Sequence, residues 1–283
     1  MKLEVNLSPV VKPVARHSAF TLIELLVVIS MIGILAAITM PTLSNWRRAD
    51  AMTAATRQLQ DDVERARQLA ISHRTTVYMV FCPSNFWTDV AYAALPQTEK
   101  DKAQRLLDKQ LSAYTFVTLR GAGSQPGQLS PRYLSDWRTL PEGTIIPYSK
   151  FRPYISGLDL FFHDPPWPAA PTNTYRVRTF TWTNNIPFPS PEAYNPAFPN
   201  QRFVSVPYIG FNHLGQLTSG VDEFIPLAKG RVAPALDANK VPLQQSPTVV
   251  ENPPGNSTNA FTLVRIDWLT GRARVEKQQL PPQ

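Results

Sequence analysis

An unbroken apolar run over residues 20–40, FTLIELLVVISMIGILAAITM, constrains the fold more than any other feature of this chain. Glu24 is its one charged residue. A helix of this length measures about 32 Å at ~1.5 Å per residue, and the hydrocarbon core of a membrane is ~30 Å thick. The run therefore predicts a membrane-spanning helix over residues 20–41. A plain signal anchor and an uncleaved secretory signal peptide are the simplest forms of such a helix.

The segment before the run argues against both simple forms. Residues 1–19 are polar, with three cations and one acid, and the small residue Ala19 directly precedes the apolar run. A secretory signal peptide has its small-residue cleavage site after the apolar region instead. In addition, Glu24 lies one helical turn inside the run, where a carboxylate is costly without a partner. We therefore expect residues 1–19 to be a leader peptide of a different kind.

The stretch from Ala19 to Val28, AFTLIELLVV, resembles the prepilin cleavage and N-methylation motif of type IV pilins and type II secretion pseudopilins. The resemblance implies that a membrane-embedded prepilin peptidase cuts between Ala19 and Phe20 and methylates the new amine of Phe20. The family usually has glycine where this chain has Ala19. Alanine is small enough to be tolerated there.

The resemblance also assigns roles inside the apolar run. It implies that Glu24 is the assembly residue and that Gly33 and Pro41 weaken the helix, since proline removes a helix hydrogen bond. The positive residues on the two sides of the run are balanced, so charge does not orient the chain. The resemblance places the leader in the cytoplasm, the helix in the inner membrane and the rest outside the cytoplasm. The implied partners are the prepilin peptidase, other pilin or pseudopilin subunits, the inner-membrane assembly platform and membrane lipid.

A second helical segment is predicted over residues 42–72. Apolar residues recur there at spacings of three and four, which is typical of one face of an amphipathic helix. These stripe residues are Met52, Ala55, Leu59, Val63, Ala66 and Ala70. Such a stripe usually packs on its own domain, although in this family the same helix also packs on neighbouring subunits.

Residues 73–283 are predicted to form one β-rich domain outside the cytoplasm. Short β-branched and aromatic runs alternate with Gly, Pro and Asn, which indicates strands and turns. The predicted strands are Thr76–Phe81, Tyr114–Leu119, Tyr175–Trp182, Phe203–Ile209, Phe261–Trp268 and Arg272–Glu276. A short helix capped by Thr98 is expected over the following residues, EKDKAQRLLDKQ. Twelve prolines from Pro141 to Pro199 predict loops and edge strands, because proline cannot donate to a sheet.

The expected fold class is α+β, with a long N-terminal helix packed on an antiparallel β-rich domain that has long proline-rich loops. The segment DDVERARQLAISHRTTVYMVF resembles the branch of the H-type minor pseudopilins and the FimT-like pilins. In that branch the N-terminal helix runs directly into the first strand.

Catalytic and metal-binding patterns are absent from the sequence. Cys82 is the only cysteine and is predicted to be a small core residue, and the four histidines are far apart. Asp222 and Glu223 fall short of the six to eight oxygens that calcium requires. Asn256-Ser257-Thr258 fits a glycosylation sequon but is interpreted as a polar loop. The sequence therefore predicts no enzyme, no cofactor and no metal site.

Two kinds of function remain. The first is a structural subunit of a pilus or of a secretion-type filament. The alternative is a binding module at a filament tip that contacts DNA or a surface glycan. It is suggested by the formal net charge of +7 and by basic and aromatic residues that can bind a single strand through charge and stacking. These residues are Arg265, Arg272, Arg274 and Lys277, together with Trp167 and Trp182. A solvated strand face with core aromatics accounts for the same residues and is the interpretation that we favour.

Overall fold

The computed structural model describes residues 22–121, 124, 129–152, 161–162, 175–198 and 201–276, and within these ranges it leaves out the side chains of residues 37–50, 161–162, 175–176 and 259. The chain forms two compact units, Met1–Arg47 and Arg48–Gln283. The predicted leader, residues 1–19, lies outside the described residues.

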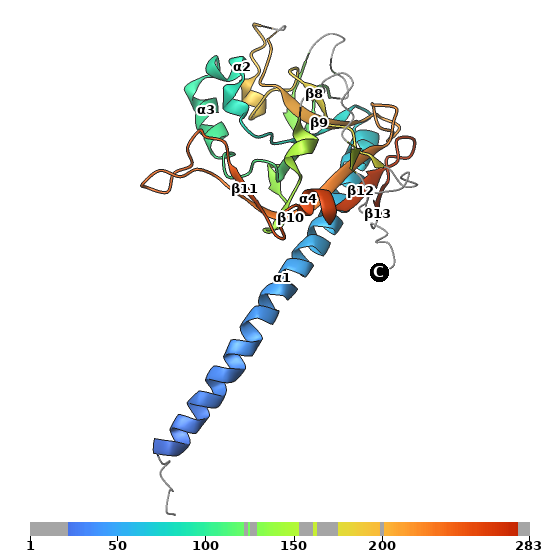
Figure 1. Ribbon diagram of the computed structural model, residues 1–283. Helices are drawn as coiled ribbons and strands as arrows, with labels where there is room; N and C mark the ends of the chain where they lie inside the picture. Colours follow the sequence, from blue (N-terminus) through green and yellow to red (C-terminus); the bar gives the residue numbers. More distant parts are fainter. Residues whose placement is uncertain are drawn as a thin grey trace, which may run out of the picture. The chain divides into compact units, whose positions relative to one another are not determined.

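One long helix, α1 (Leu22–Ser72), contributes to both units (Figure 1). Gly33 and Pro41 both lie inside it, and the helix is continuous through both positions. It ends at the residue where the predicted amphipathic segment ends. Four residues separate it from the first strand, β1 (Val77–Phe81), so the helix leads directly into the sheet.

The first sheet is antiparallel and has β1 at its centre. Its strand order is β3-β2-β1-β9-β8, and β4 pairs with the other end of β2. The strands besides β1 are β2 (Ala113–Thr118), β3 (Arg132–Tyr133), β4 (Arg138–Thr139), β8 (Thr181–Thr183) and β9 (Val206–Phe211). In the register of the two central pairings, Met79 lies opposite Phe116 on β2 and opposite Ile209 on β9.

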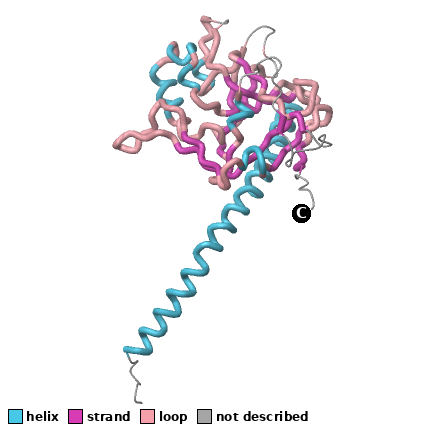
Figure 2. The backbone as a smooth tube through the Cα atoms, viewed as in Figure 1, coloured by secondary structure: helices cyan, strands magenta, loops and turns pink. Residues whose placement is uncertain are grey.

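Helices pack against both faces of this sheet. Met79 and Phe81 of β1 pack into a core with α1, whereas the alternating residues Val80 and Cys82 pack into a second core with the short helices. These helices are α2 (Val90–Ala93) and α3 (Gln97–Gln104). The predicted stripe of α1, from Met52 to Ala70, is buried in the first core throughout. Figure 2 shows the strands between the last part of α1 and the short helices.

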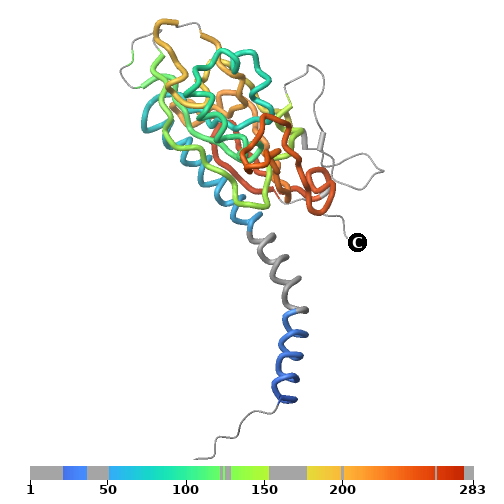
Figure 3. Tube along the Cα trace, turned by 90° about the vertical axis from the view of Figure 1, so that its left-hand side faces the viewer, coloured from blue at the N-terminus to red at the C-terminus, as the bar shows by residue number. Residues whose placement is uncertain are grey.

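A second antiparallel sheet closes the first core from another side. Its order is β11-β10-β12-β13, with β5 also paired to β10. The strands are β5 (Thr144–Ile145), β10 (Glu223–Ala233), β11 (Thr248–Glu251), β12 (Thr262–Ile266) and β13 (Ala273–Glu276). Ile225, Leu227, Val264 and Ile266 of this sheet join the core around α1. The second half of α1 therefore packs against both sheets. Figure 3 shows the last part of this helix along one side of the β-rich domain.

The remaining elements are short. A two-stranded pair joins β6 (Phe161–Phe162) to β7 (Tyr175–Arg176). Single 3₁₀ turns lie at Phe86–Thr88, Tyr148–Phe151 and Pro191–Ala193, and α4 covers Asn256–Asn259. The α+β class and the antiparallel β-rich domain are confirmed for the described residues.

Two predicted elements need correction. The short helix begins at Gln97 with Pro96 as its N-cap residue, so Thr98 lies inside the helix and does not cap it. It ends at Gln104, and residues 105–110 form turns in place of the further helical turn that we expected. The predicted strand Tyr175–Trp182 is wrong as one element, since β7 and β8 divide it between different sheets.

The longest strand, β10, was not predicted at all. Its sequence contains Pro226 and Gly230, which usually indicate the end of a strand. In the structure Pro226 still lies opposite Leu263 in the pairing with β12. At Gly230 a Cβ atom would lie 3.0 Å from the carbonyl oxygen of Val250, so glycine permits the close approach of β11.

The surroundings of Cys82 and Asn256 were also predicted from the sequence. Cys82 is buried as predicted, although it lies just after β1 and not within the strand. Burial raises the pKa of its thiol well above the ordinary value. Asn256 was expected in a polar loop but is buried at the start of α4, where its side-chain amide donates to the carbonyl of Lys229 at 3.1 Å.

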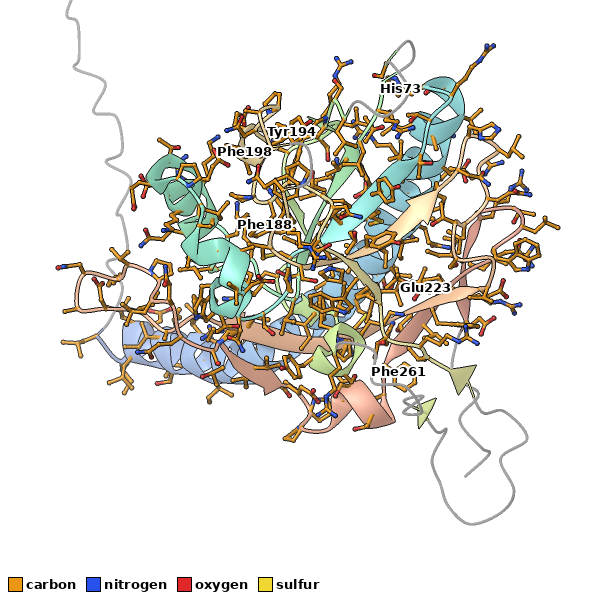
Figure 4. All side chains as sticks on the ribbon, turned by 90° about the horizontal axis from the view of Figure 1, so that it is seen from above. His73, Phe188, Tyr194, Phe198, Glu223 and Phe261 are labelled. Carbon is orange, nitrogen blue, oxygen red and sulfur yellow. The ribbon has the colours of Figure 1, made fainter. Side chains whose placement is uncertain are left out.

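Buried charges inside the domain are paired, as the cost of desolvation requires. Lys150, whose side chain is fully buried, contacts the carboxylate of Glu223 and donates to the carbonyl of Arg178 at 2.6 Å. Figure 4 marks the position of Glu223. Its ammonium also lies 4.6 Å from the ring centre of Phe180. Burial lowers the pKa of Lys150, and the Glu223 carboxylate opposes this shift.

A fragment that begins at Asn45 is expected to fold without the apolar segment, because the second unit starts at Arg48 and the buried stripe starts at Met52. Near-UV circular dichroism and limited proteolysis measure this. A fragment that begins at Arg65 is the control. It lacks four of the six stripe residues, from Met52 to Val63, and should not fold. Complete proteolysis of the longer fragment would contradict the expectation.

Replacing Lys150 by Met should lower the free energy of unfolding by about 3–5 kcal/mol, because Glu223 is left buried without its cation. The double variant Lys150→Met with Glu223→Leu should recover most of that loss, because no buried charge remains. Denaturant unfolding of the full chain in nonionic detergent measures both. Equal destabilisation in the single and double variants would show that packing of the lysine stem, and not its charge, matters.

Candidate functional site

The first part of α1, residues 22–36, is apolar on every side. Its large side chains are all exposed, from 43% for Val28 to 83% for Leu22. A helix that is apolar all round is stable only where other apolar groups surround it, either in a membrane or against other helices. The stripe of the same helix further along, by contrast, is covered by its own domain.

Residues 22–36 include two polar side chains, those of Glu24 and Ser30. Ser30 donates its hydroxyl to the carbonyl of Leu26 at 2.8 Å, which removes the cost of placing it among apolar residues. Glu24 is the charged residue of the segment and lies in the first turn of α1. The N-terminus of a helix favours a negative charge, so this position is electrostatically suitable for a carboxylate.

The structure locates only some of the predicted site residues. Ala19 and Phe20, the predicted cleavage and methylation site, lie outside the described residues. Apart from its chain neighbours and the backbone of its own helix, Gly33 has no atom within 4 Å of the place where a Cβ would be, so a larger residue would fit there. Pro41 lies inside the helix, but its side chain is not described.

In the part of the chain that the structure describes, no helix has both the length and the hydropathy that a membrane span requires. The predicted span over residues 20–41 also includes residues 20 and 21 and the side chains of residues 37–41, which are not described.

The basic residues predicted to contact nucleic acid differ in their exposure and in their ion pairs. Arg265 is engaged by two carboxylates, at 2.6 Å from Asp222 and 3.1 Å from Glu276, and these hydrogen bonds raise its pKa. Arg272 and Arg274 are exposed. Lys277 and Trp167 lie outside the described residues, and Trp182 packs partly buried against the core around α1. Contact with nucleic acid stays a prediction.

The adjacent carboxylates Asp222 and Glu223 form ion pairs. Asp222 holds Arg265, and Glu223 holds Lys150. Within the described residues, no group of three or more His, Cys, Asp and Glu side chains comes together for a metal ion. Sequence reasoning assigned no role to Glu99, Lys102 and Glu192, which the fold brings together from separate segments.

Comparison with protein families finds a match at the N-terminal segment of the chain. Residues 14–40 match the prokaryotic N-terminal methylation motif. The chain thus carries the motif of proteins that are processed as prepilins, which supports a pilin or pseudopilin type of protein. No curated protein and no solved structure matches the chain.

Proposed function

We propose that this chain is a structural subunit, a pilin or pseudopilin, of a type IV pilus or of a type II secretion-type filament. The observation that carries the proposal is the exposed apolar surface of residues 22–36, which lies within the methylation motif. An apolar surface of this extent requires a membrane or other apolar helices to cover it. A filament subunit is covered first by the membrane and then by the helices of other subunits. The motif also points to a structural subunit and not to an enzyme.

Before assembly, in this proposal, residues 20–41 anchor the chain in the inner membrane with the β-rich domain outside the cytoplasm. The prepilin peptidase removes the leader and methylates Phe20. The assembly platform then moves the subunit from membrane lipid into a bundle of helices from neighbouring subunits. The helix surface that lipid covered is covered by other helices in the filament, so no apolar area becomes exposed to water.

Glu24 is the proposed assembly residue. It lies four positions after Phe20, so its carboxylate is roughly 6 Å along the helix from the mature N-terminus. In a bundle of staggered helices it can pair with the positively charged amine of a neighbouring Phe20. Charges in such apolar surroundings are stable only when they are paired.

The direct passage from α1 to β1 supports the finer proposal of the branch that holds the H-type minor pseudopilins and the FimT-like pilins. A second candidate function, contact with DNA or a surface glycan at a filament tip, is supported by the exposed guanidinium groups of Arg272 and Arg274. The ion pairs of Arg265 weaken this candidate, because they leave fewer positive groups to attract an anion.

Processing provides the direct test of the proposed function. In a host with an active prepilin peptidase, the purified chain is expected to begin at Phe20 with a methylated amine. Removal of three cations and one acid lowers the formal net charge from +7 to +5. Intact-mass and N-terminal analysis of membrane-extracted protein measure the cleavage. A chain that still begins at Met1 would overturn the proposal. A peptidase-deficient host is the control.

Replacing Glu24 by Leu is expected to leave membrane insertion unchanged and to reduce incorporation into filaments severely. Loss of a buried charge pair typically costs ~3–5 kcal/mol, which corresponds to more than a hundredfold in an equilibrium. Sheared-filament fractions from cells with equal membrane levels of each protein measure incorporation. Ser30→Leu is the matched control, since it increases the apolar character of the same helix without removing a charge. Equal recovery of the Glu24 variant and the wild type would exclude Glu24 from assembly.

A further inference from the structure

A hollow of about 840 Å³ opens in the layer of α2 and α3. It is bordered by the link between these helices and by the loop that follows the 3₁₀ turn at Pro191–Ala193. Its apolar walls include Pro96, Tyr194 and Phe198. Figure 4 shows Tyr194 and Phe198 on the same side of the domain as these two helices.

The loop that borders the hollow is held in shape by its own amides. Gln201 donates its side-chain N–H to the carbonyl of Ala193 at 3.2 Å, and its Oε1 accepts from the backbone N–H of Asn195 at 3.3 Å. The Oδ1 of Asn195 accepts from the backbone N–H of Ala197 at 3.0 Å. These hydrogen bonds hold the described residues of the loop in place before a ligand arrives, which reduces the entropy lost on binding.

Glu192 supplies the charge among the described residues that line the hollow. Its Oε2 lies 2.5 Å from the hydroxyl of Ser190 and 3.1 Å from Nζ of Lys102. The hydrogen bond from Ser190, with further help from Lys102, lowers the pKa of Glu192 to about 2. Lys102 also pairs with Glu99 at 2.7 Å, so two carboxylates share one ammonium and this trio has a net negative charge.

The same contacts argue against a serine–lysine catalytic pair. The hydroxyl of Ser190 lies 3.1 Å from Nζ of Lys102, a distance that suits proton transfer. However, the hydrogen bond with Glu99 and the pairing with Glu192 raise the pKa of Lys102. The amine therefore stays protonated and cannot accept a proton from Ser190. What this arrangement offers is a fixed negative charge beside aromatic rings.

We propose that this hollow binds a basic side chain, a guanidinium or an ammonium group carried by a peptide segment of a partner protein. The carboxylate of Glu192 neutralises the cation, and the faces of Tyr194 and Phe198 contact the cation and its aliphatic stem. A sugar fits less well, since the amides that would bind hydroxyl groups are engaged within the loop. The negative charge opposes nucleic acid and anionic lipid. Binding at this hollow does not require filament assembly.

The test compares two probes that differ in charge and hardly in shape. The amidated tripeptides Gly-Arg-Gly and Gly-citrulline-Gly are titrated against the full chain in nonionic detergent, with binding measured by calorimetry. The arginine peptide is expected to bind about tenfold more tightly, since a charge-assisted hydrogen bond contributes that order of discrimination. Equal affinity for the two peptides, or no saturable binding of the arginine peptide, would overturn the proposal.

Three variants test whether the peptide binds in this hollow. Glu192→Gln should weaken the arginine peptide about tenfold, to the level of the citrulline peptide, because it removes the charge alone. Phe198→Ala, at a side chain that is 64% exposed, should weaken both peptides while the fold is retained. Val90→Ala is the control, because Val90 is 89% exposed on α2 and does not line the hollow. Unchanged binding of both peptides in the Glu192 and Phe198 variants would place the peptide elsewhere and overturn the assignment.

Discussion

The packing of one helical stripe against two sheets is the constraint on which the domain depends. The stripe of α1 contributes three alanines, Ala55, Ala66 and Ala70, together with the larger Leu59 and Val63, and all five are fully buried. Small side chains allow the strands to approach the helix closely, and the larger ones fill the space between the sheets. Because residues of both sheets join the same core, α1 connects two sheets that would otherwise expose their inner faces to water.

The two parts of α1 suit different surroundings. Along residues 22–36 the apolar side chains cover the whole circumference, whereas from Met52 onward they form a single stripe. The first pattern suits surroundings that are apolar on all sides, and the second suits a domain on one side and water on the other. The exposed apolar segment and the buried stripe thus belong to one helix, and each pattern lies in a different unit of the chain.

The sequence predicted those parts of the fold that depend on local periodicity. The stripe from Met52 to Ala70 and the strand at β1 repeat at helical and strand spacings, and both were found. Parts that depend on distant partners could not be predicted. Lys150 and Glu223 are 73 positions apart, and β10 tolerates Pro226 and Gly230 only because its neighbours accommodate them. The methylation motif was recognisable because it is contiguous, whereas the acidic hollow combines segments about a hundred residues apart.

The charge of each surface region is determined by these long-range contacts and not by the net charge of the whole chain. A formal net charge of +7 and a basic C-terminal segment suggested an anionic ligand. In the fold, Arg265 is held between two carboxylates, and its guanidinium lies 5.7 Å from the ring centre of Phe224. It therefore connects β12 with its two neighbouring strands, β10 and β13. Conversely, Glu99 and Glu192 share the single ammonium of Lys102 and leave a negative hollow on a positive protein. Because screening limits exposed charges to neighbours within about 10 Å, a ligand at the hollow responds to Glu192 and Lys102 and hardly to the net charge. The sign of each patch, and hence the kind of ligand that it selects, is therefore determined by which side chains the fold pairs.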